Sequence, residues 1–295
     1  TLAPRTAREY ERVLMGGDFA ALRKLPAADI TDYQVAEALN RIEKRGKKVM
    51  VNRSQSYLSA VFRWATPRRH ARVVSNPVRG LPHRFNEGGR EKRFLTMPEI
   101  QAVFGRLDSG GGAPDWAAVA MWVILATGQR PGGVLEVRWE HIDLKEGKWA
   151  IPRGHRKKAG GTSPPHDVPL SPLVVEFLHQ LPRSRCGFVF PSKGKVRHKT
   201  TTDLNRRIQR RRTADLKASS EVVGHFTPHD LRRTCSTHLH RMGVPRQVVE
   251  KTLGHGDASV AGIYDRYAYW DERREALDSW GAELETCLQE VSGLG

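Results

Sequence analysis

The apolar run Trp116–Thr127, which ends at Gly128, constrains the fold of this chain more than any other feature. It covers about three helical turns and is apolar on every side, which is the pattern of a helix buried inside a globular domain. A membrane span needs about 18 or more consecutive apolar residues, and no run in the sequence approaches that length. We therefore expect a domain folded around this helix, and no membrane partner.

The length of 295 residues fits two domains, each with its own core. Before residue 90 we expect four helices, at Thr6–Met15, Ala20–Leu25, Thr31–Arg45 and Val51–Ala65. In the last helix an apolar face is formed by Leu58, Val61, Phe62 and Ala65. Residues 86–93 contain no apolar side chain and two glycines, which is typical of a linker. The predicted domains are therefore residues 1–90 and residues 91–295.

The second domain is predicted to be mainly helical with one small antiparallel β-sheet. Thr96 is expected to cap its first helix, with Pro98 in the first turn. Three short strands are expected, at Ile142–Leu144, Trp149–Ile151 and His166–Leu170. A polar loop rich in Gly, Pro and Lys joins the last two strands, and the pattern after them is helical again.

Charge and cysteine content limit the class of partner. The chain has 49 Lys and Arg against 32 Asp and Glu, a formal net charge of +17, and the surplus is densest in residues 1–92. Such a surplus favours a polyanion, with nucleic acid as the first candidate. Cys186, Cys235 and Cys287 are too few and too scattered for a disulfide framework or a metal-binding knuckle. The sequence therefore indicates a soluble protein of a reducing compartment, without a metal site.

The stretch 227–233 places two groups suited to an anion on one face of a helix. Thr227 is expected to cap this helix, with Pro228 at its first position. His229 and Arg232 are three positions apart and share a face, so a hydrogen-bond donor and a forked cation can meet one ligand. This arrangement suits a phosphate group, although such pairs also occur on helix faces that bind nothing.

A histidine and three tyrosines follow the next predicted helix, Pro245–Leu253. A glycine is expected to end this helix in a left-handed conformation, and the helix dipole would favour the protonated form of His255 beside it. Tyr264 comes nine positions later. A phenol with a pKa near 10 attacks phosphorus only where cations stabilise the phenolate. Tyr267 and Tyr269 lie close by, and the residue types alone do not choose among the three.

Further cations stand upstream of this stretch. Arg130 follows the buried helix on a glycine-rich turn, where a rigidly held guanidinium could clamp a phosphate. The alternative is an arginine that merely satisfies helix carbonyls. Lys157 and Lys158 lie in the polar loop between strands, where a flexible ammonium could reach a ligand.

The order of these motifs resembles that of the tyrosine recombinase family, the integrases of phages and other mobile elements. The matching segments are Thr127–Gly132, Trp139–Asp143, Ile151–Pro152, Pro169–Ser171, Val189–Pro191, Pro228–Thr234, Leu253–His255 and Tyr264–Tyr267. Each segment is moderately specific, whereas their shared order and spacing are highly specific. The resemblance implies a helical core-binding domain that clamps DNA, followed by a mixed α/β catalytic domain.

The resemblance implies that Tyr264 is the nucleophile and that Arg130 and Arg232 hold the scissile phosphate. Attack by the tyrosine would form a 3′-phosphotyrosyl link and release a 5′-hydroxyl, and a hydroxyl from a partner strand would then rejoin the DNA. The bond energy is retained, so neither a metal nor a cofactor such as ATP is expected. The implied function is a site-specific recombinase that integrates or excises a mobile element.

Three further roles follow from the same resemblance. His229 is implied to assist proton transfer at the nucleophile, and His255 to donate a hydrogen bond to the phosphate. Lys157 is implied to protonate the leaving 5′-hydroxyl, with Lys158 as the alternative one position away.

The implied partners are double-stranded DNA recombination sites and three further copies of the chain, which form a tetramer on DNA. A monomer without DNA and accessory factors that bend DNA or set direction are also expected. The implied location is the cytoplasm of a bacterial host, at the nucleoid. Because the chain begins at Thr1 and not at Met, it can be a fragment, and a preceding arm-binding domain stays an open question. The helical tail to residue 288 could dock on its own domain or on a neighbouring protomer.

One departure from the family pattern affects the expected site. Relatives usually have Glu or Asp three residues after the first arginine, where this chain has Gly133. That carboxylate braces the cations of the site, and Glu136 could replace it. The hypothesis is a competent but less well organised enzyme. The alternatives are a DNA-binding regulator or architectural protein on the same scaffold, and a type IB topoisomerase.

Overall fold

The computed structural model describes residues 4–68, 70–82, 84–85, 93–105, 114–152, 165–192, 197–217, 223–255 and 267–289. The chain divides into two compact units, Thr1–Glu91 and Lys92–Gly295, here called unit 1 and unit 2. The boundary between them falls within the predicted linker, of which residues 86–92 lie outside the described residues. Among the described helices, none combines the length and the apolar character that crossing a bilayer requires.

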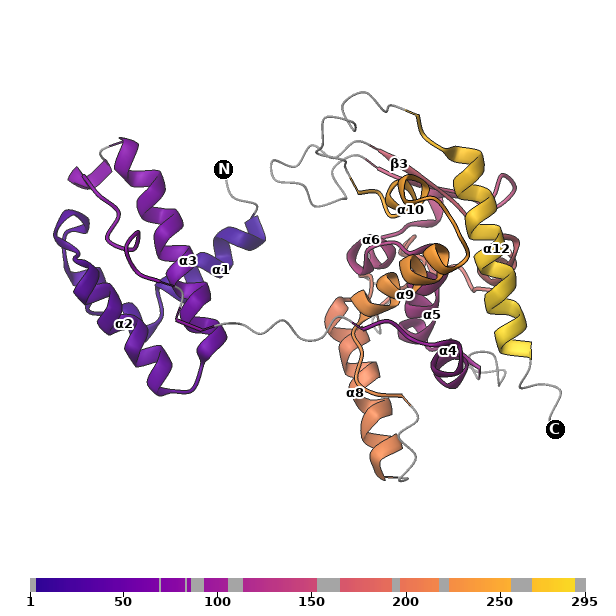
Figure 1. The fold of residues 1–295 in the computed structure, drawn as a ribbon, viewed down its shortest axis with the longest axis horizontal. Helices are drawn as coiled ribbons and strands as arrows, with labels where there is room; N and C mark the ends of the chain where they lie inside the picture. The colour runs from indigo at the N-terminus through magenta and orange to yellow at the C-terminus, as the bar shows by residue number, and fades with distance from the viewer. Residues whose placement is uncertain are drawn as a thin grey trace. The chain divides into compact units, whose positions relative to one another are not determined.

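Unit 1 is built from three α-helices, which are α1 (Pro4–Leu14), α2 (Asp32–Lys44) and α3 (Lys48–Ala65) (Figure 1). All three lie close to the predicted positions. Thr31 begins α2 through a capping box, in which its side chain accepts from the backbone of Gln34 while the Gln34 side chain accepts from the backbone of Thr31. The helices bury a separate apolar core that includes Val35, Leu39 and Phe62.

Two predictions for unit 1 were wrong. Ala20–Leu25 is not an α-helix and contains only one 3-10 turn, Leu22–Lys24, which follows another at Gly17–Phe19. Pro26 explains the break, because the residue before a proline is pushed into an extended conformation, and Leu25 has φ −98° and ψ 146°. Val61 is 42% exposed, because it lies at the edge of the buried face of α3 that Leu58 and Phe62 occupy.

Unit 2 contains most of the helices. They are α4 (Met97–Phe104), α5 (Trp116–Thr127), α6 (Pro131–Leu135), α7 (Pro172–His179), α8 (Thr201–Lys217), α9 (Pro228–Arg241), α10 (Arg246–Thr252) and α12 (Trp270–Gln289). In α5 every residue from Ala117 to Thr127 is buried, so the apolar run is the centre of the domain as predicted. It packs against α6, α8, α9 and α12, with α8 on one side and α12 on the other in Figure 1.

The predicted small antiparallel sheet is confirmed. Strands β1 (Ile142–Asp143), β2 (Lys148–Ile151) and β3 (His166–Pro169) pair in the order β1-β2-β3. Gly147 makes the turn between the first two strands with φ +57°, a left-handed conformation that favours glycine. The β2–β3 pair ends at Ile151 opposite His166, and the connection beyond it, residues 153–164, lies outside the described residues.

The tail helix α12 docks on its own domain. Leu277, Trp280 and Leu284 are fully buried, and the indole Nε1 of Trp280 donates to the carbonyl of Leu125 in α5 at 3.0 Å. The Trp280 ring also stacks on His238 of α9, with ring centroids 5.0 Å apart. Within the described residues the tail therefore completes the core of unit 2.

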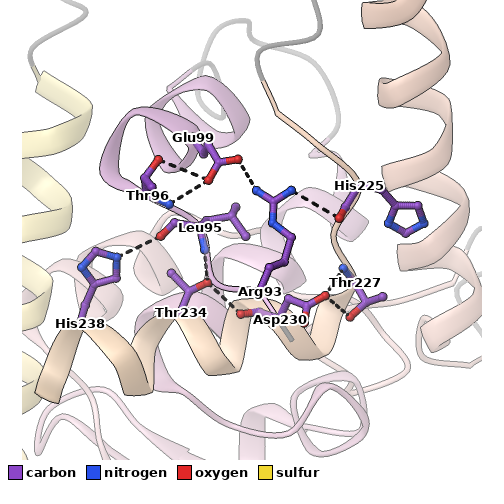
Figure 2. Close-up of polar contacts among 9 residues, drawn as sticks. All are labelled: Arg93, Leu95, Thr96, Glu99, His225, Thr227, Asp230, Thr234 and His238. Carbon is purple, nitrogen blue, oxygen red and sulfur yellow. Dashed lines mark hydrogen bonds and ion pairs between the residues drawn. The ribbon is translucent and has the colours of Figure 1, made fainter. Parts of the chain in front are cut away.

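The segment that enters unit 2, residues 93–96, lies along α9 and is called the strap. The Leu95 backbone donates to Thr234 Oγ1 at 2.9 Å and accepts from His238 Nε2 at 3.0 Å (Figure 2). Thr96 and Glu99 form the capping box that begins α4, as the sequence predicts for Thr96. Leu95 thus fixes the strap against the helix that carries His229 and Arg232.

Candidate active site

Helix α9 begins as the sequence predicts, and its first turn displays His229 and Arg232. Thr227 and Asp230 form a capping box, in which Asp230 accepts from the backbone and the hydroxyl of Thr227 at 2.8 and 2.7 Å. Burial of Asp230 opposes its ionisation, but these hydrogen bonds and the ion pair with Arg233 lower the pKa of its carboxyl. The charged cap therefore fixes the start of the helix.

Arg232 ties three segments of the chain together. Its side chain is buried, with 3% of the residue exposed. The guanidinium donates to the carbonyl of Gly128 at 2.9 Å and to the carbonyl of Leu253 at 2.8 Å, and Nη2 lies 2.7 Å from His255 Nε2. A rigid fork of donors can reach several acceptors at once. The ends of α5 and α10 are thereby held beside α9.

The turn after α5 brings the carbonyl of Gly128 close to α9. Gly128 ends α5 in a left-handed conformation with φ +65°. A Cβ atom there would lie 2.9 Å from Leu253 Cδ2 and 3.0 Å from Cys235 Sγ, so the turn requires glycine. Burial raises the pKa of Cys235 to about 12, so its thiol stays protonated and packs as an apolar group.

Gln129 and His166 join the same centre, although the sequence did not single them out. Gln129 is 2% exposed and its side chain donates to the carbonyl of Thr252 at 2.8 Å. His166 Nε2 lies 3.3 Å from the same carbonyl, so the end of the β2–β3 pair adjoins the end of α10. Gln129 stands in the recognised Thr127–Gly132 segment, whereas nothing in the sequence pairs His166 with Thr252.

Arg130 lies at the start of α6, next to this centre. Its side chain is half-buried, and burial lowers the pKa of its guanidinium. Within the described residues it has no hydrogen-bond or ion-pair partner. It is close enough to His229 for its charge to lower the pKa of that imidazole. A partly desolvated, unpaired cation favours an anionic ligand.

His255 follows α10, with Gly254 left-handed at φ +63° as predicted. Its Nδ1 contacts the carboxylate of Glu250, and its Nε2 faces the guanidinium of Arg232. A guanidinium offers only donors, so Nε2 is the acceptor in this contact.

His229 is exposed at the surface, beside several cations. Partial desolvation lowers the pKa of its imidazole, and the charges of Arg233 and Arg232 lower it further, while Asp230 opposes the shift. The ring is therefore mostly neutral near pH 7 and able to accept a proton.

We expect NMR titration to find the pKa of His229 below its ordinary value of about 6.5. The folded state then binds this proton less tightly than the unfolded state, so the contribution of His229 to stability is present above pH ~6.5 and falls as the pH drops toward the folded pKa. Arg233→Gln should raise the pKa of His229, whereas Arg241→Gln, farther along α9, should leave it unchanged. A pKa in the wild type above the unfolded value would contradict this account.

Three proposed site residues or alternatives, Lys157, Lys158 and Tyr264, lie outside the described residues. The residues that flank the segment with Tyr264 are described, and both contact α10. His255 contacts Glu250, and the carbonyl of Tyr267 accepts from Lys251 Nζ at 3.0 Å.

The surroundings of Tyr267 count against it as the nucleophile. Glu272 first, and then desolvation and Asp271, raise the pKa of its phenol above the ordinary value. Carboxylates therefore stabilise the neutral phenol, which is the opposite of what an attacking tyrosine requires. The Tyr267 ring packs edge-on against Tyr269, with centroids 4.7 Å apart.

Gly133 lies on the short helix α6, in open surroundings. A Cβ atom built there meets no other atom within 4 Å. Glu136 ends the same helix and is exposed. Residue 133 therefore has room for a Cβ atom, as an acidic residue at this position would require.

Of the four described site residues, His229, Arg232 and His255 line one pocket of about 360 Å³. The other residues of its wall are Arg93, Phe94, Arg233, Ser236, Thr237 and Leu253. Arg130 is not part of this wall, and it joins the group through the Gly128–Gln129 turn. Arg93 and Glu250 escaped the sequence reasoning, because the contacts that place them beside the site depend on the tertiary fold.

Comparison with known proteins places these residues in a family. The phage integrase family matches residues 93–269, and the phage integrase central domain matches residues 1–81. The integrase of Shigella phage Sf6 is 25% identical over 266 residues, which are 88% of this chain and 65% of that protein. The chain thus spans slightly less than two thirds of that relative.

Two solved structures have the same fold. The Tn1549 transposon integrase, in complex with circular intermediate DNA, superposes with a TM-score of 0.68 at 17% identity, covering 93% of this chain and 94% of that one. The lambda integrase tetramer, bound to a Holliday junction, superposes with a TM-score of 0.62 at 21% identity, covering 88% and 74%. Because the family match extends over more than half of the sequence, this chain belongs to the phage integrase family.

Proposed function

We propose that this protein is a site-specific DNA recombinase that cuts and rejoins strands through a 3′-phosphotyrosyl intermediate. One observation carries the proposal: the buried guanidinium of Arg232 joins the ends of α5 and α10 and lines one pocket with His229 and His255. A preorganised group of cations and donors stabilises charge that develops on a phosphate in the transition state.

In the proposed first step, the Oη of Tyr264 attacks the scissile phosphorus. The bond from phosphorus to the 5′-oxygen breaks, and that oxygen takes a proton from Lys157 or Lys158. His229, which is mostly neutral near pH 7, accepts the phenol proton. A 5′-hydroxyl from a partner strand then attacks the phosphotyrosyl link, and the tyrosine is released.

Arg130 and Arg232 are proposed to hold the non-bridging oxygens of the phosphate, and His255 to donate to it. The half-buried Arg130, without a partner among the described residues, supports this role. For His255 to donate, its Nε2 must turn from Arg232 to the phosphate and carry a proton. Glu250 contacts Nδ1 on the opposite side of the ring and holds the imidazole in place.

The proposed substrate is double-stranded DNA at the ends of a mobile element and at its target. Unit 1, which matches the phage integrase central domain, is proposed to bind DNA through its basic surface. A solved relative is a tetramer on a Holliday junction, and we propose the same assembly here, with accessory factors that bend DNA or set direction. The site of action would be the bacterial nucleoid.

A second candidate is a DNA-binding regulator on the same scaffold that does not cut. Gly133 is the observation that favours it, because relatives carry an acid there that braces the cations. The triple anchorage of Arg232 and the Glu250–His255 contact favour the enzyme, because binding alone does not require a rigidly organised pocket.

The deciding experiment is covalent trapping on a nicked duplex that contains the end sequence of the element. The nick lets the fragment with the 5′-hydroxyl diffuse away, so an active enzyme accumulates as a protein–DNA adduct. We expect peptide mapping to place the nucleotide on Tyr264, Tyr264→Phe to form no adduct, and Tyr267→Phe to retain it. Specific binding without any adduct would favour the regulator.

A further inference from the structure

We infer that the pocket lined by His229, Arg232 and His255 also holds a second phosphate of the DNA strand, next to the scissile one, and that Arg93 is its principal ligand. This inference rests on the proposed function, and it concerns residues to which that function assigns no role. They are Arg93, Arg233, Ser236 and Thr237.

The wall of the pocket has the chemistry of an anion site. Its described residues contribute the guanidinium groups of Arg93, Arg232 and Arg233, and none of these residues carries a carboxylate. The hydroxyls of Ser236 and Thr237 are half-buried and make no hydrogen bond to other described residues. Glu99 and Asp230 pair with Arg93 and Arg233 without lining the pocket themselves. The three guanidiniums and two hydroxyls of the wall suit a ligand with several negatively charged oxygens.

Along α9, the residues proposed to bind the second phosphate lie beyond those proposed to bind the scissile phosphate. His229 and Arg232 lie on the first turn, whereas Arg233, Ser236 and Thr237 share a face that continues into the next turn. One helical turn rises by about 5.4 Å, so Ser236 and Thr237 lie about one turn beyond Arg232 and Arg233. A strand whose scissile phosphate lies at Arg232 can bring its neighbour toward these hydroxyls and Arg93, which line the same pocket.

The guanidinium of Arg93 is preorganised for a contact with this phosphate. Its Nη2 pairs with the Glu99 carboxylate and its Nη1 donates to the carbonyl of His225 at 3.4 Å (Figure 2). The strap behind it is fixed by the two hydrogen bonds between Leu95 and α9. A guanidinium has five N–H groups, and the described residues occupy two of them. The remaining edge of Arg93 is thus oriented before DNA arrives.

The test is a scan of the nicked substrate in which single phosphates near the scissile one are replaced by neutral methylphosphonates. On the unmodified substrate, Arg93→Gln should slow adduct formation about 10- to 100-fold, the range for a lost hydrogen bond to a charged group. At the phosphate that Arg93 contacts, the methylphosphonate should slow adduct formation by the wild type by a similar factor. The same replacement should not slow Arg93→Gln any further. At other positions both proteins should lose rate in parallel.

Two further variants distinguish the effects of the position and the charge of the Arg93 guanidinium from a failure to fold. A Cβ atom at Gly224 would lie 2.8 Å from Arg93 Nη1, so Gly224→Ala should displace the guanidinium, keep its charge and give a smaller loss at the same position. The control is Arg241→Gln, which removes a charge from α9 at a residue outside the pocket wall. The Arg241 guanidinium lies 4.5 Å from the ring centroid of Phe94. This variant should keep the wild-type rate. If Arg93→Gln does not fold, the position-specific rate loss of Gly224→Ala tests the proposed contact instead.

The inference is overturned if the variants at residues 93 and 224 lose rate equally at every position, or lose none. If the wild type forms no adduct on the unmodified substrate, the proposed function itself fails. The two failures are therefore distinguishable.

Discussion

Replacement of Arg232 by lysine is expected to lower the rate of adduct formation by about 10²- to 10³-fold, the effect of removing one preorganised donor from a site that stabilises developing charge. Lysine keeps the positive charge but places it on a single ammonium. One ammonium cannot reproduce the contacts of Arg232 to Gly128 and Leu253 and also face His255. The measurement is the single-turnover rate of adduct formation on the nicked duplex at saturating protein.

The matched control is Arg241→Lys, because Arg241 lies on the same helix and outside the pocket. It should keep the rate and the stability of the wild type. Arg232→Lys should also lose about 1–3 kcal/mol of unfolding free energy, since it leaves buried carbonyls without their donors. If Arg232→Lys cuts at the rate of the wild type, the forked geometry is not required and the proposed role of Arg232 is wrong.

Replacement of Trp280 by alanine is expected to cost about 3–5 kcal/mol of unfolding free energy, the usual range for a large buried side chain. The ring is 1% exposed, stacks on His238 and donates to the carbonyl of Leu125. The substitution therefore opens a cavity among α5, α9 and α12 and leaves a buried acceptor unsatisfied. Calorimetry should show a lower transition temperature for unit 2 and an unchanged one for unit 1.

Two comparisons identify the cause of that loss. Trp280→Phe keeps an apolar ring but removes the donor, and should cost about 1–3 kcal/mol. Leu216→Ala in α8 changes a side chain that is 52% exposed and should stay within about 0.5 kcal/mol of the wild type. A cost below about 1 kcal/mol for Trp280→Ala would indicate that α12 docks on another protomer in solution.

Elements governed by local chemistry were predictable from the sequence. The apolar run gave α5 residue for residue, and the caps at Thr96 and Thr227 marked the starts of α4 and α9. Capping and left-handed turns depend on residues within one helical turn, so the chain itself carries that information. The segment Ala20–Leu25 failed because a local pattern of helix-forming residues could not outweigh the proline that follows it.

The contacts that organise the site were not predictable in the same way. Arg232 was recognised as a site residue, but its acceptors are backbone carbonyls, and every residue carries one of those. Arg93 was assigned to a linker, because its pairing with Glu99 and its place beside α9 depend on the strap. The contact of His255 with Arg232, 23 residues earlier in the chain, likewise depends on the tertiary fold and not on the end of its own helix.

The sequence by itself determined that the chain folds around a buried helix, is mainly helical with a small sheet, and carries the ordered motifs of its family. These features follow from local propensity and from the identity of single residues. The tertiary structure decided that α12 completes the core of its own domain and which carbonyls hold Arg232. It also decided that Arg93 shares a pocket with Arg232 and His255. Such contacts join segments far apart in sequence, and only the folded packing brings their atoms within hydrogen-bonding distance.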